Sequence, residues 1–116
     1  MKFDLKYMRA VLEVDAKILG QILEVPNLGC RKILDPQNLK LSEITVEKLF
    51  ALQETLEYAE DVFDDKKTAA LWFHATLIAL GGNSPLYFIS TPGVEGLKRL
   101  TAVRELLGQI RYSLYC

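Results

Sequence analysis

Residues 72–108, WFHATLIALGGNSPLYFISTPGVEGLKRLTAVRELLG, decide how this chain folds. A helical pattern of apolar residues runs up to Gly81 and Gly82, where it stops. Ser84-Pro85 and Thr91-Pro92 then each pair a hydroxyl residue with a proline, which is typical of an N-cap followed by the first residue of a helix. The sequence therefore predicts a short apolar segment after Ser84 and a longer helix that starts at Thr91 and ends at Gly108.

The composition is that of one folded domain. Of 116 residues, 50% are hydrophobic and 25% are charged, and 14 basic residues nearly balance 15 acidic ones. This balance argues against strong non-specific binding of nucleic acid, which requires clustered positive charge. Cys30 and Cys116 are too few for a disulfide framework, so we expect a cytoplasmic protein. No apolar run approaches the length that crosses a membrane, and we expect no membrane partner.

The first half of the chain has the outline of a helix-turn-helix. Apolar residues recur at helical spacing over residues 5–14, and Asp15 can cap a second helix that carries Ile18, Leu19, Ile22 and Leu23 on one stripe. A turn-rich break and a short helical piece at residues 30–34 follow. This piece would expose Arg31 and Lys32 as candidate DNA contacts, although two cations beside Asp35 make a poor reader of a DNA groove.

The middle of the chain predicts two further helices. Thr45 caps the longest one, residues 46–63, whose polar face is acidic. That face is either a solvated surface or a patch for a basic partner. Asp64-Asp65 ends this helix and caps the next, which runs to Leu80 and is apolar nearly all round. Such a helix is buried on more than one side or covered by another chain.

The last helix and the residues after it differ in their periodicity. Residues 94–107 are amphipathic, with the predicted inward side chains Val94, Leu97, Leu100, Val103, Leu106 and Leu107. Residues 109–116 alternate apolar and polar side chains with the period of a strand, but the sequence offers no second strand to pair with. We therefore expect an extended tail that packs back on the helices or docks on another protein.

Candidate catalytic chemistry is sparse. His74 is the only histidine and has no companions at metal-ligand spacing, so we expect a structural, at least partly buried side chain. The glycines at positions 81 and 82 lack the lysine and the spacing of a phosphate-binding loop. These patterns predict no catalytic residue, no metal and no cofactor, and hence a protein that is not an enzyme.

A set of turn, cap and core residues resembles the C-terminal toxin-binding domain of the Xre/MbcA/ParS antitoxin family. The set comprises Trp72, Leu80, Gly81, Gly82, Ser84, Pro85, Thr91, Gly93, Leu106 and Gly108. The first part of the chain is similar in layout to the family's degenerate Xre-like helix-turn-helix. The resemblance implies an all-α bundle with a helix-turn-helix region at residues 1–58 and a toxin-binding domain at residues 59–116.

The resemblance also implies a function. Antitoxins of this family neutralise RES-domain toxins, which consume NAD, and their C-terminal region covers or enters the toxin's active site. Here this implies a homodimeric antitoxin of a type II pair that blocks the toxin with its tail, through Gln109, Ile110, Arg111, Tyr112, Leu114 and Tyr115. The alternative is a helix-turn-helix regulator that binds operator DNA.

Overall fold

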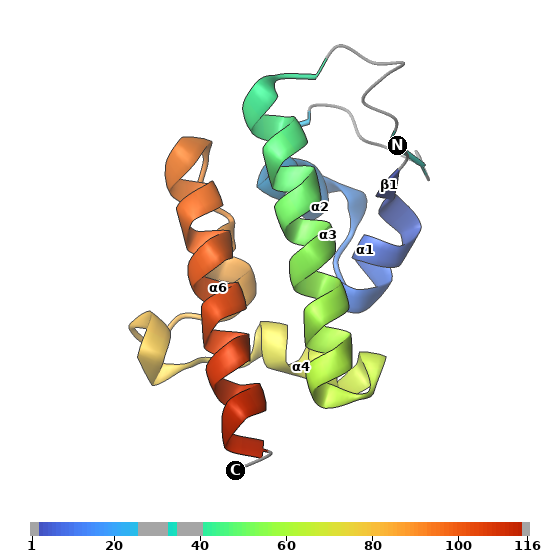
Figure 1. Ribbon diagram of the computed structural model, residues 1–116. Helices are drawn as coiled ribbons and strands as arrows, with labels where there is room; N and C mark the ends of the chain where they lie inside the picture. Colours follow the sequence, from blue (N-terminus) through green and yellow to red (C-terminus); the bar gives the residue numbers. More distant parts are fainter. Residues whose placement is uncertain (1–2, 26–32, 35–40, 115–116) are drawn as a thin grey trace.

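The computed structural model describes residues 3–25, 33–34 and 41–114 (Figure 1). The all-α prediction is confirmed. The elements in order are β1 (Phe3–Asp4), α1 (Leu5–Leu12), α2 (Ala16–Leu23), β2 (Ile33–Leu34), α3 (Glu43–Phe63), α4 (Lys66–His74), the 3-10 helix η1 (Ile78–Leu80), α5 (Pro85–Ile89) and α6 (Gly93–Leu114).

The two long helices, α3 and α6, lie side by side and form the centre of the bundle (Figure 1). The two N-terminal helices pack on α3, and α4 contacts both α1 and α3. Between these helices lies one buried apolar cluster, whose members include Leu52 and Leu56 of α3 and Leu100 and Val103 of α6. The toxin-binding half predicted from sequence is therefore packed on the N-terminal half. The boundary expected after residue 58 falls inside α3.

Aspartates cap the first two helices. The Asp4 side chain accepts a hydrogen bond from the amide of Tyr7 at 3.1 Å, and Asp15 accepts one from Ile18 at 2.9 Å. Each helix ends at a glutamate in the left-handed conformation, Glu13 or Glu24. The predicted cap at Asp15 is thus confirmed, and the stripe that follows it buries Leu19, Ile22 and Leu23.

The prediction of a short helix at residues 30–34 is wrong for its last two residues, Ile33 and Leu34. Ile33–Leu34 form β2, which pairs antiparallel with β1 so that Phe3 faces Leu34 and Asp4 faces Ile33. The backbone groups of β2 form their hydrogen bonds with β1 and not within a helix. A helix here would in any case be short, because Pro36 disfavours the helical conformation of Asp35. The candidate DNA contacts Arg31 and Lys32 lie outside the described residues.

Helix α3 begins earlier than predicted. Its N-cap is Ser42, whose hydroxyl oxygen accepts a hydrogen bond from the amide of Thr45 at 3.2 Å. Thr45 is instead buried inside the first turn and donates its hydroxyl proton to the carbonyl oxygen of Leu23 at 2.9 Å. The sequence offers two suitable capping hydroxyls, and contact with α2 decides between them.

Helix α4 ends at His74, six residues before the predicted end at Leu80. The backbone after it makes a different set of hydrogen bonds, in which the Leu77 amide donates to Asn83 and the Gly82 amide to Leu77. Two glycines at positive φ allow this turn, which periodicity alone does not reveal. The His74 residue is largely exposed, yet its Nε2 makes a partly buried contact with the Leu12 carbonyl oxygen at 2.6 Å, in keeping with the structural side chain expected from sequence.

The two predicted helix starts after this turn have different outcomes. Ser84 caps α5 through the amide of Tyr87, with Pro85 in the first turn, as predicted. Thr91, however, is not seen to cap α6: its hydroxyl oxygen accepts a hydrogen bond from Arg99 at 2.8 Å. Among the predicted inward residues of α6, Leu100, Val103 and Leu107 are buried, whereas Val94 is 60% exposed.

The extended tail is the largest error of the sequence-based prediction. Helix α6 continues through Gly108 to Leu114, so residues 109–114, which were expected to alternate as a strand, extend the helix by nearly two turns. Gly108 is not among the residues at positive φ and does not end the helix. The cause lies in the contact between α6 and α3, described below.

Candidate functional site

A cluster of five side chains joins the C-terminal half of α6 to α3, and we name it the Tyr58 clasp. The guanidinium groups of Arg104 and Arg111 lie 5.0 and 5.6 Å from the centre of the Tyr58 ring. Arg104 pairs with Glu54 at 2.8 Å, and Arg111 pairs with Asp61 at 2.5 Å. Two acidic residues of α3 therefore pair with arginines of α6 in the same chain. The sequence suggested only a solvated surface or a patch for a basic partner, and not this pairing within the chain.

The clasp explains why α6 does not stop at Gly108. A Cβ atom at this position would lie 3.5 Å from the Tyr58 hydroxyl oxygen, an ordinary contact distance, so Gly108 lies against Tyr58 inside the contact between α6 and α3. Arg104 and Arg111 are seven residues apart, which places them two turns apart on one face of a helix. Only a continuous helix puts both arginines against the same tyrosine.

The predicted toxin-binding residues consequently lie on or beyond the last turns of α6. Tyr112 is 76% exposed, Ile110 is half-buried and Gln109 is exposed. Arg111 belongs to the clasp and keeps 45% of its side chain exposed. Leu114 is the last residue of α6, and Tyr115 lies outside the described residues. The structure thus brings the described positions among them, residues 109–112 and 114, to the C-terminal end of α6 (Figure 1).

The remaining predicted motif residues shape the turns. Trp72 is half-buried, with its ring 5.9 Å from that of Phe63 and 5.2 Å from that of Phe73. Gly81, Gly82 and Gly93 all adopt positive φ, which favours glycine. These residues, with Ser84 and Pro85, set the path of the chain between α4 and α6.

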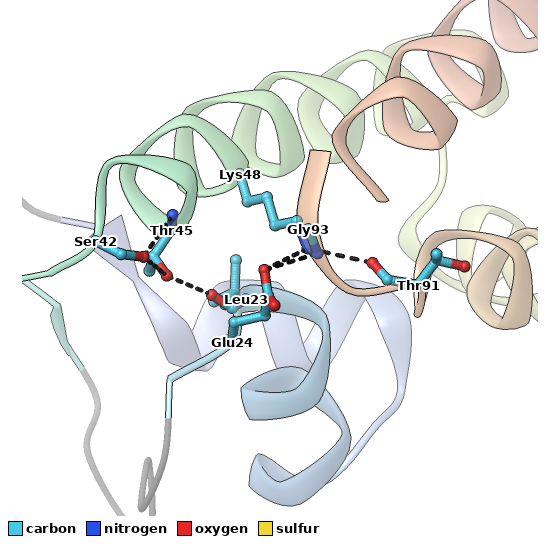
Figure 2. Close-up of polar contacts among 7 residues, drawn as sticks. All are labelled: Leu23, Glu24, Ser42, Thr45, Lys48, Thr91 and Gly93. Atoms are coloured by element: carbon cyan, nitrogen blue, oxygen red, sulfur yellow. Dashed lines mark hydrogen bonds and ion pairs between the residues drawn. The ribbon is translucent and has the colours of Figure 1, made fainter. Parts of the chain in front are cut away.

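A second polar cluster, which we name the Lys48 bracket, joins three parts of the chain (Figure 2). The Lys48 ammonium group, on α3, is fully buried and donates to the Glu24 carboxylate at 2.9 Å and to the Thr91 carbonyl oxygen at 3.2 Å. The same Glu24 oxygen accepts a hydrogen bond from the amide of Gly93 at 3.1 Å. The bracket therefore holds the start of α6 against α3 and the end of α2.

The Glu24 carboxylate is stabilised in its charged form. The hydrogen bond from Lys48, and then that from the Gly93 amide, lower the pKa of Glu24 below its ordinary value. A negative charge at the N-terminus of α6 also interacts favourably with the helix dipole. Gly96 completes the arrangement, because a Cβ atom there would lie only 1.9 Å from the Thr91 carbonyl oxygen and 2.9 Å from Lys48 Nζ.

Sequence reasoning did not single out Lys48, Glu24 or Gly96. A lysine on a surface helix is expected to be exposed, and its partners are 24 and 43 residues away in sequence. The one local signal was Gly96, because a glycine inside a helical pattern usually has a packing reason.

Large apolar side chains are unevenly exposed in the described part of the chain. Six of them are prominent at the surface, and only Phe50 precedes α4. The others are Leu71, Ile78, Tyr87, Val94 and Tyr112. Five of the six exposed side chains thus fall in the part of the chain from α4 onward, and exposed apolar side chains are one feature of surfaces that bind other proteins.

Within residues 3–25, 33–34 and 41–114, no group of three or more His, Cys, Asp or Glu residues could hold a metal ion. In the same residues no helix is both long and apolar enough to span a bilayer.

The fold places the molecule in the class of small all-α bundles. Residues 59–112 match the family model of the antitoxin Xre/MbcA/ParS C-terminal toxin-binding domain. This match, which covers just under half of the chain, supports the resemblance to Xre/MbcA/ParS-type antitoxins and a role as the toxin-binding member of a toxin–antitoxin system. A comparison with curated proteins gave no significant match.

Proposed function

We propose that this antitoxin binds a RES-type toxin, an enzyme that consumes NAD, and blocks its active site with the C-terminal end of α6. The observation that carries the proposal is the exposure of Tyr112 on the helix end that the clasp holds in place. The family match supplies the toxin as the partner. We further propose that the antitoxin acts as a homodimer.

The structure changes how we expect the blocking element to act. A helix end is already ordered before binding, so its insertion costs less conformational entropy than the ordering of an extended tail. Tyrosine offers a large contact area with few rotatable bonds. Arg111 is engaged with Asp61 and Tyr58, so we assign it to positioning the helix end, and we assign toxin contact to Tyr112.

Operator binding has less support than toxin binding. The expected recognition helix is replaced at Ile33–Leu34 by a strand, and the two candidate DNA contacts lie outside the described residues. No described residue adds an observation in favour of the regulator, so we do not develop this alternative.

Co-expression tests the proposal. The neighbouring reading frame is expressed with the intact chain, with a chain ending at Gly108, or with the Tyr112→Ala variant, and growth and cellular NAD are followed. We expect rescue by the intact chain, weakened rescue by Tyr112→Ala and none by the shortened chain. Lys98→Ala, an exposed change on α6 outside the clasp, is the matched control and should rescue fully. Full rescue by the shortened chain would refute blocking by this helix end.

A further inference from the structure

One long segment of the toxin-binding domain carries no formal charge. No Asp, Glu, Lys or Arg occurs from Thr68 to Val94, although these residue types make up 25% of the chain. Ahead of α6, the segment nevertheless exposes three large apolar side chains, Leu71, Ile78 and Tyr87. Depletion of charge together with exposure of apolar groups is the composition of the centre of a protein interface.

Ile78 is the most exposed of these side chains, at 97% of its surface. Ile78 begins η1, within the turn between α4 and α5 (residues 75–84), which we name the Ile78 turn. This segment projects from the edge of the bundle in Figure 1. An isoleucine in this position gives the fold almost no buried area, so the hydrophobic effect in the isolated chain does not account for it.

The backbone of the Ile78 turn is fixed by its own hydrogen bonds. The Leu77 amide donates to the Asn83 carbonyl oxygen at 3.1 Å, and the Gly82 amide returns a bond to Leu77 at 2.9 Å. The Asn83 side chain adds a bond to the Leu80 carbonyl oxygen at 3.1 Å, and Leu80 itself is buried. Ile78 is therefore presented on an ordered support, which lowers the entropic cost of binding through it.

We propose that the Ile78 turn is a second contact with the toxin, separate from the end of α6, in which Ile78 enters an uncharged apolar depression outside the active-site cleft. This inference rests on the proposed function. The turn supplies affinity, and the end of α6 supplies inhibition. The toxin is the occupant because the turn lies within residues 59–112, the domain whose family binds toxins.

The shape of the turn argues against a second copy of this chain as the occupant. A two-fold symmetric contact requires a surface that is complementary to itself. A single projecting side chain needs a concave partner, and two such side chains facing each other on a symmetry axis would bury little area. The lack of charge in the segment further predicts that this contact is insensitive to salt.

The test measures binding and inhibition separately, with the purified enzyme from the neighbouring reading frame as the probe. Affinity is determined by calorimetry for the intact chain, Ile78→Ser, Ile78→Val and the matched control Val94→Ser. Val94 is also an exposed β-branched residue, but it lies at the start of α6, at the other end of that helix from Tyr112. Inhibition of NAD consumption is measured with saturating antitoxin, and thermal unfolding monitors the fold.

We expect Ile78→Ser to weaken toxin binding by about ten- to a hundred-fold, the range set by burial of one such side chain. Ile78→Val and Val94→Ser should bind nearly as the intact chain does. Saturating Ile78→Ser should still inhibit fully, and its unfolding temperature should not change. The chain ending at Gly108 should bind without inhibiting, and Ile78→Ser should weaken its binding by the same factor.

Three results would overturn the inference while leaving the proposed function in place. The first is unchanged affinity of Ile78→Ser for the toxin. The second is an equal loss in Val94→Ser, which would indicate general apolar adhesion. The third is conversion of a dimer to a monomer by Ile78→Ser with unchanged toxin affinity, which would assign the turn to a second copy. Failure of the intact chain to bind the enzyme at all would instead refute the proposed function, and the inference with it.

Discussion

Gly108 of α6 faces Tyr58 of α3, and a Cβ atom added to the glycine would lie 3.5 Å from the tyrosine's hydroxyl oxygen. The glycine therefore marks a contact between two helices and not the end of one. Arg104 and Arg111 lie over the same ring, each with an acidic partner on α3. This arrangement keeps the last turns of α6 helical and sets the direction in which Tyr112 is presented.

Two glycines of α6 should respond oppositely to alanine. Gly96→Ala forces a Cβ atom to within 1.9 Å of the Thr91 carbonyl oxygen, and we expect it to destabilise the fold by about 2–4 kcal/mol. Gly108→Ala meets only ordinary contacts and gains helix propensity, so its stability should be unchanged or higher by up to about 1 kcal/mol. Urea denaturation measures both, and equal losses would contradict the different roles assigned here.

Lys48 should be essential for stability despite its usual place on surfaces. Lys48→Met leaves the Glu24 carboxylate with only the Gly93 amide and leaves the Thr91 carbonyl oxygen without this donor. Because Glu24 keeps part of its side chain in solvent, we expect a loss of about 2–3 kcal/mol, below that of a fully buried pair. The exposed Lys98→Met is the control. Chemical denaturation that shows the two variants equally stable would refute the importance of the bracket.

The bracket should also make stability depend on pH. The pKa of Glu24 is lower in the folded chain than its ordinary value of 4.5, so on acidification the unfolded chain takes up the proton first. The stabilisation is complete above pH 4.5 and is lost as the pH falls through the folded-state pKa.

Comparing the unfolding free energy of the intact chain with that of Glu24→Gln isolates this contribution from that of other acids. Asp65 is one of these, because hydrogen bonds with Thr68 also lower its pKa. The difference in unfolding free energy between the two proteins should be largest near neutral pH and shrink below pH 4.5. A difference that stays constant down to pH 3 would show that the charge of Glu24 does not contribute.

Loss of the clasp should loosen the end of α6 without unfolding the protein. Asp61→Asn removes the charge that holds Arg111, but the pair is exposed, so we expect a global change below about 1 kcal/mol. Hydrogen exchange at the amides of the last two turns of α6 should become several-fold faster. Glu47→Gln, an exposed change elsewhere on α3, should leave these amides unaffected. Unchanged exchange in Asp61→Asn would mean that the ion pair does not hold the helix end.

What the sequence predicted correctly is mostly local. The caps at Asp15 and Ser84 depend on a side chain and the amides three residues later, and both appear as expected. The apolar periodicity of α2 and of the middle of α6 likewise reports the buried face directly. The family resemblance, carried by turn residues such as Gly81 and Gly82, is confirmed by the match over residues 59–112.

The errors share a different cause, which is contact between residues far apart in sequence. Ile33–Leu34 become a strand because β1 pairs with them, and α6 continues past Gly108, where Arg104 and Arg111 contact Tyr58 and acidic residues of α3. The start of α3 depends on the carbonyl of Leu23. The residues of the proposed site stay a prediction, and the shape of the segment that carries them, a helix end, depends on contact with α3.

Competition for the toxin's active site tests blocking by the α6 end most directly. Calorimetry would measure the affinity of the purified toxin for the intact chain at rising concentrations of a non-reactive NAD analogue. We predict mutually exclusive binding, with an apparent Kd that rises in proportion to analogue concentration for the intact chain and stays constant for the chain ending at Gly108. A ternary complex of toxin, analogue and intact chain, with an unchanged Kd, would contradict the account.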